Sequence, residues 1–118
     1  MIKRYWLVTQ SNAPQLVQWR VEVIINGKLI KTIKSEENFY PFEITKYLHP
    51  GRNSIIFNAI KDLTGGRRST SHKHWYQIII GEGHPEGGTV IIDNPNISFT
   101  LTAAETENKH REFILNAQ

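Results

Sequence analysis

The chain has 118 residues, of which 39% are hydrophobic and 21% are charged. A chain of this length and composition is expected to fold as a single domain, residues 1–118, with its own core rather than to remain disordered. The net charge of +3 is mild, so it permits a polyanionic partner without requiring one. There is no cysteine, which excludes a disulfide framework and any thiolate metal site.

The first ten residues include basic side chains, but their apolar run is too short for a signal peptide. No segment reaches the length of a transmembrane helix. We therefore expect synthesis in the cytoplasm and no membrane partner.

In chain order, the first expected element is a strand over Ile2 to Thr9, followed by a turn at residues 11–14. Apolar residues at positions 19, 21, 23 and 25 then alternate with mostly polar ones, which predicts a strand with one buried face. Asn26-Gly27 follows at once, and both residues tolerate the positive φ of a two-residue type I′ turn. The return strand over residues 29–33 completes a predicted β-hairpin.

Residues 39–53, FYPFEITKYLHPGRN, predict a strand, one short helical turn and the start of another strand. Because Pro41 cannot donate to a strand ladder, we expect this strand to lie at an edge or to start after Pro41. Thr45 is expected to cap a single turn that ends by Leu48, since Pro50-Gly51 prevents further helix growth.

These two segments resemble a known family. The run V-x-x-N-G-K-L, followed by P-F-E-I-T-K-Y-L-x-P-G-x-N-x-I, looks like the galactose-binding-like jelly-roll, which serves as the sugar-binding accessory domain of many glycoside hydrolases. The match covers Trp19 to Ala59, about a third of the chain, and Glu43 stands where that family more often has Asp. The matching residues belong to turns and caps, so the resemblance implies a fold and carries over no binding residue.

The rest of the chain predicts further strands separated by loops. The expected elements are a polar loop over Lys61–Lys73, a strand over His74–Ile80, a glycine-rich turn over Gly81–Gly88, a short strand over Thr89–Asp93, a turn over Asn94–Asn96, a strand over Ile97–Ala103 and a last strand over Glu112–Asn116. About nine short strands predict an all-β fold, an antiparallel β-sandwich of the jelly-roll type. Its inner face is expected to include Trp19, Val21, Val23, Ile55, Phe57, Phe99 and Leu101.

The polar loop gathers Arg67, Arg68 and Lys73, and Trp75 and Tyr76 follow it. Forked arginines on a glycine-containing tip suit contact with a protein partner, which is our partner-binding hypothesis. Basic residues beside aromatics also suit nucleic acid, but the total charge falls short of a strong basic footprint, so nucleic acid is disfavoured. The alternatives are a solvated loop that leads into a core strand, or aromatic rings at 75 and 76 that stack on a ligand such as a sugar.

No pattern in the sequence points to catalysis. His72 and His74 would share one face of a strand, but a zinc site needs three or four ligands and nothing shows others converging, so we expect no metal. Glu82 and Glu86 could form a carboxylate pair, yet no nucleophile motif or phosphate loop accompanies them. We expect a non-enzymatic protein without a cofactor.

The function that we expect is a structural or docking module of a larger assembly, such as a phage capsid or tail decoration protein that is incorporated in a virion. This expectation rests on a sandwich that starts at its own Met1, ends soon after its last strand and has no attached catalytic domain. Exposed strand edges favour a homo-oligomer or a place on a larger lattice. The alternative is a carbohydrate-binding module, based on the resemblance and on an aromatic content of 10%.

Overall fold

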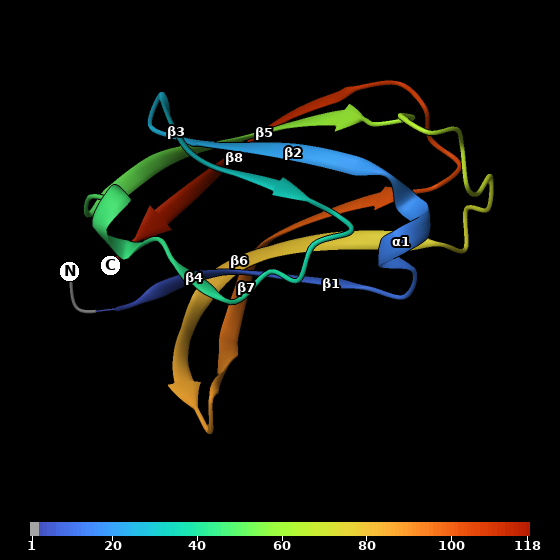
Figure 1. Cartoon of the computed structure of the whole chain (residues 1–118). Coiled ribbons are helices and arrows are strands. Elements are labelled where there is room, and N and C mark those ends of the chain that lie inside the picture. The colour runs from blue at the N-terminus through green and yellow to red at the C-terminus, as the bar shows by residue number, and fades with distance from the viewer. Residues whose placement is uncertain (1–2) are drawn as a thin grey trace.

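The structure is a computed structural model that describes residues 3–118. In this part of the chain, eight strands form two four-stranded antiparallel sheets that pack face to face (Figure 1). The first sheet has the strand order β4-β1-β6-β7, and the second has the order β3-β2-β5-β8. The predicted antiparallel β-sandwich is therefore confirmed, and β6 lies between β1 and β7 in the first sheet.

The strands are β1 (Tyr5–Ser11), β2 (Trp19–Ile25), β3 (Lys28–Lys34), β4 (Phe42–Glu43), β5 (Gly51–Lys61), β6 (Trp75–Glu86), β7 (Thr89–Thr102) and β8 (Lys109–Ala117). A four-residue helix, α1 (Pro14–Val17), joins β1 to β2, and a 3-10 turn (Thr45–Tyr47) joins β4 to β5. The sequence predicted only a turn where α1 lies. Pro14 occupies the first turn of this helix, where its fixed φ favours helical backbone.

The predicted hairpin is confirmed as β2 and β3. Asn26 and Gly27 have φ values of 49° and 82°, the left-handed backbone that a type I′ turn requires. The side chains of β2 alternate as predicted, with residues 19, 21, 23 and 25 buried between the sheets.

The core lies between the two sheets, and all seven residues predicted for the inner face are buried. Phe57 of β5 stacks on Phe99 of β7, with ring centroids 5.1 Å apart and ring planes at 9°. Phe113 of β8 meets Phe57 edge-on at 5.8 Å. Aromatic pairs of this kind add to the free energy gained by area burial alone, so these rings fasten one sheet to the other.

One buried polar side chain joins four segments at one end of the sandwich. The amide nitrogen of Asn53 donates to the carbonyls of His49 and Gly51 at 2.9 Å each, and to that of Leu115 at 3.3 Å. Its amide oxygen accepts from the backbone of His49 and from the side chain of Asn26. Asn53 is fully buried, yet these bonds use both its donor and its acceptor, so its burial leaves neither group unpaired.

The edge position of the segment after Pro41 is confirmed, because β4 starts at Phe42 and lies at the end of the first sheet. The capping role expected for Thr45 is wrong. Its hydroxyl accepts a hydrogen bond from the backbone N–H of Tyr5 at 2.9 Å and donates to Glu43 at 2.9 Å. Thr45 thus links the short turn to β1 rather than to its own helix.

The predictions for residues 81–96 need the largest correction. β6 continues to Glu86, so the turn is confined to Gly87-Gly88, and β7 is one strand where two were expected. Pro95 lies inside β7, opposite Gly81, and the pairing shifts register on either side of this stretch. Such bulges and an edge position accommodate a proline in a strand, which is why the residue did not end β7.

We predict that Phe57→Ala lowers the free energy of unfolding by about 3–5 kcal/mol, through lost transfer energy and a cavity between the sheets. Thr100→Ala, on the exposed face of β7, should cost less than about 0.5 kcal/mol. Urea denaturation of both variants measures the difference. Equal losses would contradict the assignment of faces in β7.

Candidate functional site

A two-stranded arm leaves the sandwich at one end of β6 and β7. Pairing of β1 with β6 ends at Tyr5 and Glu82, and beyond this point β7 is the one strand of residues 3–118 that pairs with β6. We call residues 83–93 the arm. Figure 1 shows it projecting away from both sheets. Two-stranded hairpins are only marginally stable in water, so the arm depends on its anchorage or on a partner.

Trp6 and two glycines anchor the base of the arm. The indole N–H of Trp6 donates to the carbonyl of Gly83 at 3.1 Å, and the N–H of Gly83 donates to the carbonyl of Arg4 at 3.0 Å. A Cβ added at Gly81 would collide with the carbonyl of Asn94, and one at Gly83 would collide with the carbonyl of Ile91. Only glycine permits this close approach of the two strands.

Arg4 contacts the indole ring of Trp6 as well. Its guanidinium lies 4.9 Å from the centre of the Trp6 ring and donates to both carboxylate oxygens of Glu43, at 2.8 and 3.0 Å. The hydrogen bonds from Arg4 lower the pKa of the Glu43 carboxyl. The base of the arm is thus connected to β4 through an aromatic ring and an ion pair.

The outer part of the arm presents acidic and apolar side chains to solvent. Ile91 is 42% exposed and lies directly opposite His84 in the pairing of the two strands. His84 contacts two carboxylates, Asp93 at 2.7 Å and Glu86 at 3.4 Å. The hydrogen bond to Asp93 raises the pKa of His84, and Glu86 adds to the shift.

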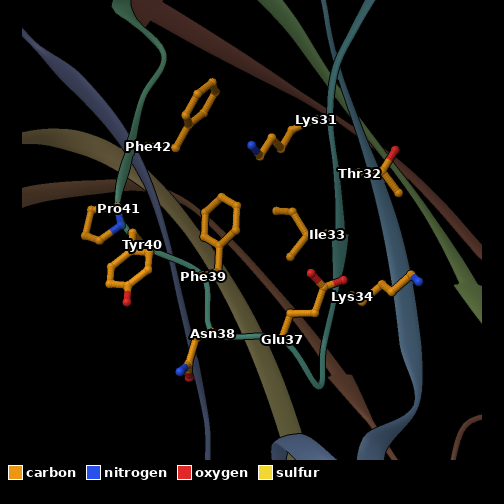
Figure 2. Close-up of a pocket in the computed structure, with 10 residues that line it drawn as sticks. All are labelled: Lys31, Thr32, Ile33, Lys34, Glu37, Asn38, Phe39, Tyr40, Pro41 and Phe42. Carbon is orange, nitrogen blue, oxygen red and sulfur yellow. The ribbon is translucent and has the colours of Figure 1, made fainter.

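A groove lies between β3 and the segment that crosses from the second sheet to the first. Its volume is about 370 Å³, and we call it the β3 groove. Its lining residues are Lys31, Thr32, Ile33, Lys34, Glu37, Asn38, Phe39, Tyr40, Pro41 and Phe42. Figure 2 shows Lys31 and Ile33 pointing from β3 toward the rings of Phe39 and Phe42. The Lys31 ammonium lies 5.1 Å from the centre of the Phe42 ring and 5.9 Å from that of Phe39.

The arginines of the polar loop are bonded within the chain. The Arg67 guanidinium donates to the backbone carbonyls of Ser69, Ala103 and Ala104 at 2.9 to 3.1 Å. Arg68 donates to the carbonyl of Gln15 at 3.0 Å. These bonds connect the loop to α1 and to the end of β7.

Gln18 and Lys61 form further hydrogen bonds at the same loop and its neighbouring segments. Gln18 is 6% exposed; its amide donates to Gly66 and accepts from the backbone of Arg68. Lys61 donates to the carbonyls of Val17 and Ala103, and its partial burial lowers its pKa. The loop is therefore fixed by backbone carbonyls at several points rather than being a mobile tip.

The remaining predicted residues lie apart from one another. The Lys73 side chain is exposed near the end of the loop. Tyr76 is 3% exposed and belongs to the core, where burial raises the pKa of its phenol well above its usual value. Trp75 lies on the opposite face of β6 and is half-buried, so it is the ring of this pair that reaches the surface.

His72 and His74 do not form a metal site in the structure. The ring of His74 is hydrogen-bonded to the hydroxyl of Ser69 at 2.7 Å, and His72 is exposed. Over residues 3–118, no group of three His, Cys, Asp or Glu side chains is arranged to hold a metal ion. No helix in that range has the length and apolar character needed to cross a membrane.

Comparison with known proteins gives no match to a protein family, to a curated protein or to a solved structure.

Sequence reasoning missed both the arm and the groove. The sequence predicted a glycine-rich turn over Gly81–Gly88 and a short strand over Thr89–Asp93, but not that β6 continues to Glu86 and pairs with that strand to form an arm. One available signal was the charge pattern, because residues 74–108 contain no Lys or Arg. The groove has no signature in sequence, since β3 and the crossing segment meet only in the folded chain.

We predict that Asp93→Asn lowers the pKa of His84, because the variant removes the negative partner that favours the imidazolium. In the native arm the pKa is raised, so the His84 contacts stabilise the folded state below the pKa of an unfolded histidine and are lost as the pH rises through the folded value. NMR titration of the imidazole measures both proteins. Glu107→Gln is the control, and an unchanged His84 titration in Asp93→Asn would refute the pairing.

We also predict that Arg67→Ala lowers the free energy of unfolding by about 1 kcal/mol, because the carbonyls of Ala103 and Ala104 lose a charged donor. Lys73→Ala, in the same loop, should change stability by less than about 0.5 kcal/mol. Thermal denaturation compares the two variants. The reverse order of stability would show that the Arg67 bonds do not hold the loop.

Proposed function

We propose that the protein is a non-enzymatic docking module that works on a larger assembly, of the kind that virion and tail decoration proteins serve. The observation that supports this proposal is the arm. Its residues extend past the end of β1, the strand that pairs with β6 in the sandwich. They bury few side chains in the core of their own chain, and Ile91 is exposed. A projecting two-stranded element with an exposed apolar residue is stabilised when another protein covers it.

The anchorage of the arm favours the same interpretation. The bonds of Trp6 and Arg4 to Gly83 fix the direction in which the arm leaves the sandwich. A fixed direction reduces the entropy that is lost on docking. An arm that is rigid at its base and apolar toward its end suits attachment to a protein surface.

We place the partner contact on the arm rather than on Arg67 and Arg68. The guanidinium groups of both residues already donate to carbonyls of their own chain. Lys73 remains exposed and can add a charge contact beside the loop.

A second candidate function is carbohydrate binding, and the β3 groove is the feature that supports it. The rings of Phe39 and Phe42 lie there beside the polar side chains of Glu37 and Asn38. This candidate goes together with the proposed jelly-roll relationship, for which the resemblance over Trp19 to Ala59 is the support. A glycan array tests it, with Phe39→Ala as the variant that should lose the signal. If the native chain binds no glycan on the array, carbohydrate binding is excluded.

We predict that shortening the arm releases the protein from its assembly. Gly83 pairs with Ile92, so an Asn-Gly dipeptide in place of residues 84–91 closes the hairpin with a type I′ turn and leaves the sandwich intact. Tagged native and shortened chains are expressed in the source cells, and the extracts are fractionated by size. The native chain should elute in a complex, and the shortened chain should elute as a monomer.

A point variant checks the same prediction. Ile91→Asp should reproduce the loss, whereas Leu63→Asp should keep the complex although Leu63 is exposed to a similar extent, 41% against 42%. A native chain that elutes as a monomer, or a shortened chain that stays in the complex, would overturn the proposed function.

A further inference from the structure

We infer that the partner of the arm is a second copy of this chain, and that the arm of one copy docks in the β3 groove of the next. This inference rests on the proposed docking function and names its partner and the surface that receives it. Three properties of the two surfaces match: their strand edges, their charges and their exposed apolar residues.

Both surfaces offer the outer edge of a sheet. Among the described residues, 3–118, β3 is bonded to β2 alone and β7 to β6 alone, because each is the last strand of its sheet. β3 has seven residues, about 23 Å in length, and the β7 part of the arm, residues 89–93, is about 17 Å long. The arm can therefore lie along β3 and pair with it over its whole length, as strand addition requires.

The two surfaces carry opposite charges. β3 contributes Lys28, Lys31 and Lys34 and no acidic residue, whereas the arm contributes Glu86 and Asp93 and no Lys or Arg. Glu37 is the acidic residue among the ten that line the groove, against two lysines. Lys31 reaches over the groove, so an arm carboxylate that enters would meet its ammonium group. Such complementarity steers association and fixes register.

Exposed apolar side chains lie on the same two surfaces. Of the five large hydrophobic residues that are exposed over residues 3–118, Ile91 belongs to the arm and Tyr40 belongs to the lining of the groove. Phe39 and Phe42 are part of the same lining. A docked Ile91 would cover these rings and would itself leave water.

The arm cannot reach the groove of its own chain. β7 lies at the edge of the first sheet that contacts β8, and the crossing segment from β3 leads to β4 at the opposite edge. The arm also projects away from β3, which belongs to the other sheet, as Figure 1 shows. Docking must therefore be intermolecular and head-to-tail, which generates rings or filaments rather than a closed two-fold dimer.

The test exchanges one charge on the arm and one in the β3 groove and measures self-association by sedimentation velocity. The purified full chain is studied at concentrations from about 1 μM to about 1 mM, the range of weak protein contacts. The native chain should form species larger than a monomer, less so as salt is raised. Glu86→Lys and Lys31→Glu should each weaken self-association by about tenfold or more. An equimolar mixture of the two variants should associate again, because each arm then meets a groove of opposite charge.

Controls separate this contact from a general effect of charge. Glu107→Lys and Arg52→Glu make the same charge changes at exposed positions away from both surfaces and should leave association unchanged. Hydrogen exchange should show added protection of residues 31–34 and 89–93 at high concentration. Melting temperatures of all variants establish that each is folded.

The outcomes distinguish this inference from the proposed function. A native chain that remains monomeric at all concentrations, or a mixture that fails to regain association, overturns self-docking. If the shortened arm still releases the protein from its native complex, the docking function stands with a different partner. If the native chain does not self-associate and the shortened arm does not release the protein from its native complex, both proposals fail.

Discussion

The stacked rings of Phe57 and Phe99 connect the two sheets, and the rest of the structure depends on that contact. Each ring sits on a strand with one apolar face, and the alternation of the strands leaves a single register that buries both faces at once. A shift of one residue in β5 or in β7 would turn these rings toward solvent. The packing of one sheet on the other thus follows from strand alternation. The packing in turn sets where the loops and the edge strands lie.

The placement of β7 explains why an arm exists. Once Phe99 is fixed in the core, the first half of the 14-residue strand must run beyond the sandwich, where β1 no longer accompanies β6. Gly81 and Gly83 allow the two arm strands to approach closely, and Trp6 covers the junction. The same residues that look like turn glycines in the sequence therefore create a rigid exit from the sheet.

Charge is segregated across the molecule in a way that the net charge of +3 conceals. Lysines line one edge strand, β3, and the carboxylates of Glu86 and Asp93 lie on the arm formed by β6 and β7. Separating the two signs on different surfaces disfavours collapse of one surface on the other within a chain and favours contact between chains. The polar loop, in contrast, uses Arg67 and Arg68 to satisfy its own backbone carbonyls, which makes it part of the framework.

The sequence by itself determined the sandwich, the hairpin at Asn26-Gly27, the edge position of the segment after Pro41 and the buried faces of β2, β5 and β7. These features depend on local periodicity and on residues with restricted backbone angles, so neighbouring residues suffice to predict them. Only the tertiary structure decided that β6 and β7 continue through Gly81 and Pro95, that Tyr76 is buried, and that β3 and Phe39 form a groove. Those outcomes depend on which strands become neighbours and on where β1 ends along β6. Such contacts join residues that lie far apart in the chain.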